Sequence, residues 1–140
     1  MQMQASCAAR YGAGVLLLGP PGSGKSDLLL RLLDIGFTLV ADDRVDIDDG
    51  RARPPASLAG LLEVRGLGIV RLPHVAPVRL ALAVELGRWP ERLPVPARHP
   101  GLGLPLLALD AQQISAPQRI ALALRCVLGH VPQIAGAFGA

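Results

Sequence analysis

Near its N-terminus the chain reads Gly19-Pro20-Pro21-Gly22-Ser23-Gly24-Lys25-Ser26, which fits the pattern G-x-x-x-x-G-K-[ST] of a phosphate-binding loop. The apolar residues 14–18 precede it and are typical of a buried strand. After it, apolar residues recur at helical spacing over residues 25–35. A Gly/Pro-rich turn between a strand and a helix is the alternative interpretation. The strand–loop–helix order favours a P-loop and predicts an α/β fold built around it.

The chemistry of a P-loop assigns roles to its residues. Glycines let several backbone N–H groups point at one phosphate, and the following helix adds its positive end. We therefore expect residues 19–26 to bind ATP, with Lys25 reaching the β- and γ-phosphates and the Ser26 hydroxyl binding Mg²⁺. Thirteen of the fourteen basic residues are Arg, so Lys25 is the only Lys. A compact ammonium fits the phosphate cradle better than a planar guanidinium does.

Length and composition restrict the class of protein. A chain of 140 residues with 51% hydrophobic residues is long enough for one domain with a buried core. No apolar run approaches the roughly 18 residues of a membrane span, and residues 1–18 lack the features of a signal peptide. We therefore predict a cytoplasmic protein with no membrane partner. Cys7 and Cys126 lie in apolar surroundings and are expected to be free thiols, without the spacing of a metal site.

The net charge of +3 leaves a choice between an acidic protein partner and nucleic acid. The Arg residues are scattered along the sequence, and aromatic residues make up only 3% of it. Because single-stranded nucleic acids are bound by stacking on aromatic rings, we predict no nucleic-acid partner.

Periodicity and turn residues predict the remaining elements. Strands are expected at residues 4–10, 37–41, 44–47, 61–65, 78–86 and 104–109, the last of them buried. A helix over residues 25–35 should end at Gly36, and a final helix should be capped by Ser115 and end near Gly129. Residues 48–50 form a predicted turn, residues 51–57 a Pro-containing connection, and residues 66–68 a loop. Residues 87–103 are expected to be irregular, and the tail at about residues 135–140 to fray.

Acidic residues follow two of these strands. Asp42 and Asp43 end a predicted strand, at the position where open α/β sheets place ligands. In P-loop enzymes one acidic residue helps to hold Mg²⁺, and a kinase also needs a carboxylate that accepts a hydroxyl proton. A solvated acidic turn is the alternative. Glu63 is a further candidate oxygen ligand, or else a surface charge paired with Arg65.

Three segments together resemble a known family. Residues 19–27, residues 39–45 (Leu-Val-Ala-Asp-Asp-Arg-Val) and residues 62–70 (Leu-Glu-Val-Arg-Gly-Leu-Gly-Ile-Val) resemble the catalytic domain of HPr kinase/phosphorylase. This bacterial enzyme phosphorylates a serine of HPr, the phosphocarrier protein of the sugar phosphotransferase system, and reverses the reaction by phosphorolysis. The third segment is the most specific to the family. The resemblance implies a P-loop fold related to phosphoenolpyruvate carboxykinase, often assembled as a hexamer. It also implies one domain over residues 1–140, as in the short alphaproteobacterial form that lacks the separate N-terminal regulatory domain.

The resemblance also implies roles for individual residues. Lys25 and the P-loop would bind ATP, and Ser26 with Glu63 would hold Mg²⁺. Asp43 would be the base that deprotonates the target serine, while Asp42 would support the metal or orient Asp43. Arg92 would stabilise the transferring phosphoryl group, or else form a surface pair with its neighbour Glu91.

One position departs from the family pattern. Gln4 stands where the family has a histidine on the strand before the P-loop, and an amide cannot transfer a proton near neutral pH. The prediction is therefore an ATP- and Mg²⁺-dependent serine kinase acting on HPr, with phosphorolysis left open. An ATP-sensing module with decayed catalysis and a small-molecule P-loop kinase are the alternatives.

Overall fold

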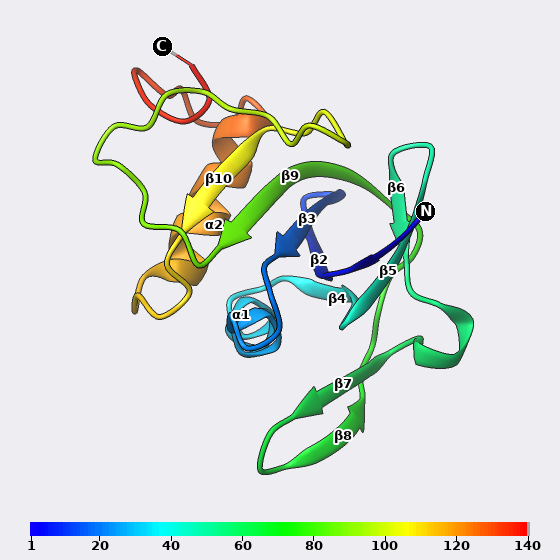
Figure 1. The fold of residues 1–140 in the computed structure, drawn as a ribbon. Coiled ribbons are helices and arrows are strands. Elements are labelled where there is room, and N and C mark those ends of the chain that lie inside the picture. Colours follow the sequence, from blue (N-terminus) through cyan, green and yellow to red (C-terminus); the bar gives the residue numbers. More distant parts are fainter. Residues whose placement is uncertain (140) are drawn as a thin grey trace.

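The computed structural model describes residues 1–139, in which strands predominate (Figure 1). The elements follow in the order β1 (Gln2–Gln4), β2 (Ser6–Arg10), β3 (Ala13–Leu18), α1 (Lys25–Asp34), β4 (Thr38–Ala41), β5 (Arg44–Asp48), β6 (Arg51–Arg53), a 3-10 turn (Ala56–Leu58), β7 (Leu61–Val64), β8 (Gly68–Arg71), β9 (Val78–Leu86), β10 (Leu106–Leu109) and α2 (Ala116–Val127).

Eight strands form one mixed sheet in the order β1-β5-β6-β9-β3-β2-β4, with β10 paired to β9. Strand β9 runs parallel to both β3 and β10. Strand β2 lies antiparallel to both β3 and β4, so β3 and β4 point in the same direction. The C-terminal ends of β3, β4, β9 and β10 therefore meet at one edge of the sheet, where β2 begins.

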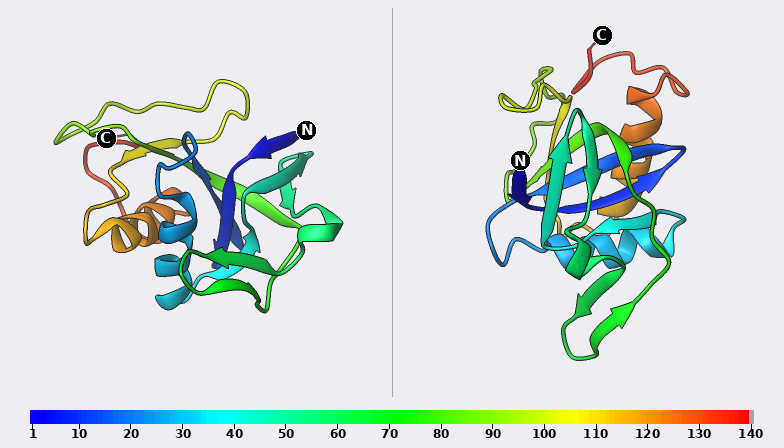
Figure 2. Two further views of the ribbon diagram at one scale, coloured as in Figure 1. Left: turned by 60° about the horizontal axis from the view of Figure 1, so that its bottom comes forward. Right: turned by 90° about the vertical axis from the view of Figure 1, so that its right-hand side faces the viewer.

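Both faces of the sheet are buried, which explains why its central strands are almost wholly apolar. Side chains alternate along a strand, so Val15 and Leu17 of β3 join one core cluster and Leu16 joins the other. The first cluster is covered by α1 and α2, which lie side by side in Figure 2. The second cluster includes Val45 and Ile47 of β5. The sheet with two helices confirms the predicted α/β class.

Most predicted elements are present, but the predictions for one strand, one connection and one loop need correction. The strand predicted at residues 4–10 is two strands, because β1 pairs with β5 whereas β2 pairs with β3 and β4. The connection predicted at residues 51–57 begins with β6, which returns from β5 through a turn whose residues Asp49 and Gly50 have positive φ. The loop predicted at residues 66–68 turns directly into β8, which the prediction missed.

The C-terminal region differs from its predictions in three details. Strand β10 is only half-buried over Leu106–Ala108, because it adds to β9 at the side of the sheet. Ser115 is the N-cap of α2, but its hydroxyl accepts a hydrogen bond from Arg119 Nε at 2.8 Å and caps no backbone N–H. The tail was expected to fray, and its residue 140 lies outside the described residues. Up to residue 139 it packs onto the body, with Ala137 buried.

The hairpin of β7 and β8 forms a small second sheet that projects from the body (Figures 1 and 2). Its base is anchored by Leu62, which is buried in the core cluster beneath α1. At its tip Leu67 and Ile69 are 73% and 68% exposed. The segment most specific to the predicted family thus forms an arm with an apolar tip.

Two further sequence expectations concern cysteines and membranes. Cys7 and Cys126 are both free thiols, as predicted, and Cys7 is fully buried on β2. Within residues 1–139 no helix has the length and apolar character needed to cross a bilayer.

Candidate active site

The P-loop connects β3 to α1 and needs its glycines for two different reasons. A Cβ on Gly19 would lie 2.5 Å from Ser23 Oγ, so the loop curls too tightly for a side chain there. Gly24, the N-cap of α1, has φ +96° and faces the Ala111 side chain. Only glycine adopts this backbone conformation without strain. The loop is therefore held as a tight curl at the end of β3, with the start of α1 directly behind it.

Lys25 is bent back over this curl. Its ammonium donates hydrogen bonds to the carbonyl oxygens of Gly19, at 2.6 Å, and of Pro20, at 3.2 Å. The positive charge is thus placed on the loop beside the N-terminus of α1, where an anion is favoured by the helix dipole.

The polar part of the site consists of the buried residues Ser6 and Asp42 and the half-buried Ser26. The Ser26 hydroxyl donates a hydrogen bond to Asp42 Oδ1 at 2.9 Å, and the Ser6 hydroxyl donates to the same oxygen at 2.9 Å. Ser6 and Asp42 are the only buried polar or charged residues within the described part of the chain. The strand directions explain this meeting, since β2 begins where β3 and β4 end.

Asp43 faces a different environment from Asp42, although the two are adjacent. Its φ of +70° places it in the left-handed region, and its side chain is exposed. The backbone is fixed on both sides, because Ala5 N–H donates to Asp43 O at 3.1 Å and Arg44 N–H donates to Asp42 O at 2.8 Å. This kink buries one carboxylate against Ser26 and leaves its neighbour in solvent. One carboxylate can therefore serve a metal while the other meets a second substrate.

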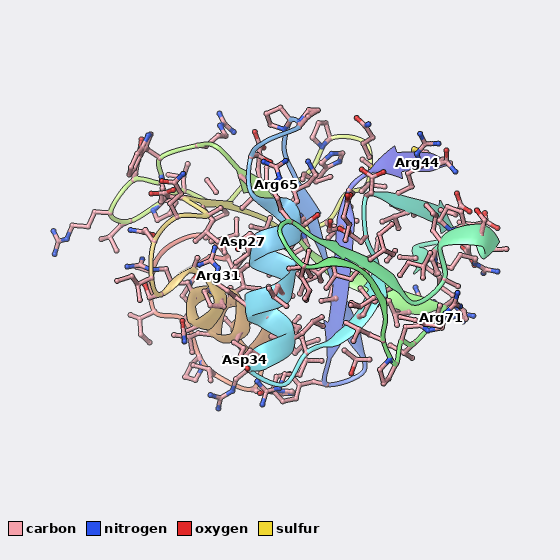
Figure 3. The ribbon with its side chains drawn as sticks, turned by 90° about the horizontal axis from the view of Figure 1, so that it is seen from below. Asp27, Arg31, Asp34, Arg44, Arg65 and Arg71 are labelled. Atoms are coloured by element: carbon pink, nitrogen blue, oxygen red, sulfur yellow. The ribbon has the colours of Figure 1, made fainter. Side chains whose placement is uncertain are left out.

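Helix α1 is fixed to the segment that precedes α2. Arg31 donates hydrogen bonds to the carbonyl oxygens of Ala111 and Gln113, and its guanidinium lies 3.2 Å from the Asp27 carboxylate. In Figure 3, Asp27, Arg31 and Asp34 follow one another along α1. The helix that carries Lys25 and Ser26 is thus held to the opposite end of the chain.

Glu63 and Arg92, both predicted from the family resemblance, are exposed and lie on other elements than this cluster. Glu63 is exposed on β7, in the projecting hairpin, and faces Ile69 across the strand pair. Within residues 1–139 no group of three or more His, Cys, Asp or Glu side chains is arranged to hold a metal. Arg92 is exposed in the long segment between β9 and β10. The roles of both residues stay predictions.

Gln4 lies beside the kink. It is exposed on β1 and pairs in register with Arg44, the residue after Asp43. The position that carries a histidine in the resembled family is therefore close to Asp43 along the backbone, but it presents an amide here.

Comparison with known proteins identifies the family. A sequence model described as the HPr Serine kinase C-terminal domain matches residues 1–86, from the N-terminus to the end of β9. The chain belongs to this family. The match includes every residue of the P-loop, the Ser6–Ser26–Asp42 cluster, Asp43 and the projecting hairpin.

Individual relatives agree with the family assignment. The chain is 36% identical over 142 residues to HPr kinase/phosphorylase from Burkholderia cenocepacia and, equally, to that from Paraburkholderia phymatum. Each comparison covers 89% of this chain but only 44% of the relative. The structure of the Hpr(Ser) kinase/phosphatase from Coxiella burnetii has the same fold, with a TM-score of 0.70 at 22% sequence identity. That comparison covers 93% of this chain and 90% of the other.

Two residues of the site were not predicted from the sequence. Ser6 is the lone hydroxyl in an apolar run, and only the register of β2 against β4 brings it to Asp42. Arg31 looks like an ordinary exposed helix residue until the fold places the Ala111 carbonyl beside it. A polar residue within a predicted buried strand was the available signal for Ser6.

Proposed function

We propose that the chain is the catalytic part of an ATP- and Mg²⁺-dependent serine kinase that acts on an HPr-type phosphocarrier protein. The hydrogen bond from Ser26 to Asp42 at the edge of the sheet carries the proposal. It joins the last P-loop residue to a buried carboxylate, as a nucleotide kinase requires for its metal. The names of the curated relatives support HPr as the protein substrate.

The residues at the sheet edge fit a site for Mg²⁺, because hydroxyl and carboxylate oxygens are the ligands that this ion prefers. Ser26 and Asp42 would hold it. Bound there, the ion neutralises charge on the β- and γ-phosphates of ATP. Lys25 and the backbone N–H groups of residues 19–26 would hold the same phosphates from the loop side. Glu63, on strand β7, which packs against α1, would be a further oxygen ligand of the ion.

In the proposed reaction Asp43 is the general base. Its carboxylate accepts the proton of the target serine hydroxyl as the serine oxygen forms a bond to the γ-phosphorus. The bond between the γ-phosphorus and the β–γ bridging oxygen breaks, and ADP leaves with that oxygen. Its exposed position in the left-handed kink suits a group that must reach another protein. Arg92 would stabilise the transferring charge if its segment closes over the loop.

The first test is phosphorylation of HPr by the purified chain with Mg-ATP, followed as gain of one phosphoryl group in the intact mass. Asp43→Asn should reduce the rate by about 10²-fold or more, the usual scale for loss of a general base, while ATP affinity stays the same. Asp49→Asn is the matched control, because Asp49 is also exposed with positive φ. It should behave as the parent. Undiminished phosphorylation by Asp43→Asn would remove Asp43 from its role.

A second candidate function is suggested by Gln4, which cannot exchange a proton in the position where the family has a histidine. In this case the chain would sense ATP and change its affinity for a partner without transferring phosphate. Binding of ATP with no phosphorylation of HPr, in the parent as well as in Asp43→Asn, would favour it. Adding excess inorganic phosphate after phosphorylation tests whether the reverse reaction occurs with Gln4 present.

A further inference from the structure

Ser6 has an unusual environment for a hydroxyl group. It is 1% exposed, its chain neighbours Ala5 and Cys7 are fully buried, and its Oγ donates to Asp42 Oδ1 at 2.9 Å. Burying a hydroxyl costs free energy unless it forms a hydrogen bond, and an alanine would fill this position at no such cost. The hydrogen bond to Asp42 is therefore the interaction that accounts for a hydroxyl group at this buried position.

Both hydroxyls bond to the same oxygen of Asp42, but they are not equivalent. Ser26 lies in the first turn of α1, next to the loop that holds phosphate. Ser6 lies on β2, which is hydrogen-bonded on both sides, to β3 and to β4. A bond from Ser26 alone leaves the Asp42 carboxylate free to turn about its side-chain dihedrals. A second donor on a rigid central strand fixes the position of Oδ1.

We propose that Ser6 is a positioning residue for the metal site. It holds the Asp42 carboxylate in the orientation in which Asp42 accepts the hydrogen bond from the Ser26 hydroxyl. A serine hydroxyl has one proton and two lone pairs. When the proton is committed to Asp42, the lone pairs are left to face a divalent cation bound with ATP. This inference rests on the proposed function of the P-loop as an ATP and Mg²⁺ site, and it does not depend on HPr as the substrate.

The experiment measures metal-dependent nucleotide binding instead of turnover. ATP affinity of the full chain is determined by calorimetry in EDTA and again with excess Mn²⁺ as the probe cation. The ratio of the two affinities is the metal factor. Ser6→Ala should reduce the metal factor by about tenfold, the lower end of the losses seen when partners of metal ligands are removed. Its ATP affinity in EDTA should stay within about twofold of the parent.

Further variants separate positioning from packing. Ser6→Thr keeps the hydroxyl and should retain the metal factor. Ser6→Cys keeps the size but is a weak donor, so it should lose the factor even if Ser6→Ala fails to fold. Cys7→Ala is the matched control on the same strand, because Cys7 belongs to the opposite core cluster, and should leave the factor unchanged. In an Asp42→Asn background, Ser6→Ala should have no further effect, as expected when two residues act as one unit.

The outcomes that would overturn the proposal are specific. A lower melting temperature of Ser6→Ala with an unchanged metal factor would mean that Ser6 only packs. An unchanged factor in Asp42→Asn would mean that Asp42 is not at the metal. A failure to phosphorylate HPr would count against the proposed function but would leave this measurement intact, since it needs only ATP and Mn²⁺.

Discussion

At the scale of single residues, the position of Lys25 in the P-loop requires a particular side-chain shape as well as a positive charge. Its ammonium reaches two carbonyl oxygens of the curled loop, at 2.6 Å and 3.2 Å. A guanidinium is planar and wider, so it cannot occupy the same place without opening the loop. An arginine at position 25, which keeps the charge but has a different shape, should therefore not replace the lysine in the proposed reaction.

We expect Lys25→Arg to lower the rate of phosphoryl transfer by roughly 10²-fold, the scale on which one electrostatic donor contributes to a transition state. Single-turnover phosphorylation with saturating Mg-ATP measures this directly. Arg71→Lys, the reverse exchange at an exposed position of β8, is the control and should have no effect. A Lys25→Arg variant as fast as the parent would show that charge alone is sufficient.

The same scale shows the limit of reading residues from the sequence. Asp42 and Asp43 were both predicted at the sheet edge, and the sequence left their division of labour open. Their environments differ because of backbone conformation: Asp43, with a φ of +70°, is exposed, whereas Asp42 is buried. Asp is among the few non-glycine residues that adopt this conformation readily, but its presence does not require it. Local propensity alone could not separate the two roles.

At the scale of elements, β2 combines a site residue with a buried thiol. Burial raises the pKa of the Cys7 thiol above its usual range. The folded chain therefore keeps a proton that the unfolded chain releases above about pH 8.5. The contribution of Cys7 to stability is complete below that pH and declines as the pH rises, by up to about 1.4 kcal/mol per pH unit.

Urea denaturation at two pH values tests this prediction. From about pH 8 to about pH 10, the free energy of unfolding of the parent should fall by about 2 kcal/mol more than that of Cys7→Ala. Equal pH dependence of the parent and Cys7→Ala would contradict the burial argument.

Helices and strands with a clear hydrophobic periodicity were predicted well from the sequence, whereas short strands that are defined by their pairing were not. The P-loop strand, α1 and β9 lie within a residue of their predicted bounds, because each has a long apolar pattern. Strands β6 and β8, of three and four residues, are too short to show a period, and pairing with β5 and β7 defines them. The meeting of Ser6 with Asp42 could not be predicted for the same reason, since it depends on strand pairing.

At the scale of the whole molecule, β9 joins parts that lie far apart in the sequence. It pairs with β6 at its start, with β3 along its length, and with β10 at its end. The start of β9 contributes Val78 and Leu80 to one core cluster, and its later part contributes Leu82 and Val84 to the other. The fold should therefore unfold as a single unit.

Leu82→Ala tests this cooperativity. Leu82 is fully buried, so the substitution should destabilise the chain by about 3 kcal/mol through lost burial and a residual cavity. In urea the midpoint should move to lower concentration with a single transition followed equally by fluorescence and circular dichroism. Leu122→Ala, at an exposed position of α2, is the control and should change little. Two separate transitions would contradict the view of one cooperative unit.

The projecting hairpin also separates two parts of the chain, residues before and after its tip, that pair with each other in the main sheet. Its Gly66-Leu67-Gly68 tip is exposed, so a protease with a preference for apolar side chains can reach the backbone there. The P-loop, Ser6, Asp42 and Asp43 all precede this tip, whereas β9, the parallel neighbour of the P-loop strand β3, follows it. A chain severed there would hold together through the shared sheet. We therefore expect that two fragments of the chain, divided at the hairpin tip, associate when mixed, and that the proposed binding of ATP is recovered only in the mixture.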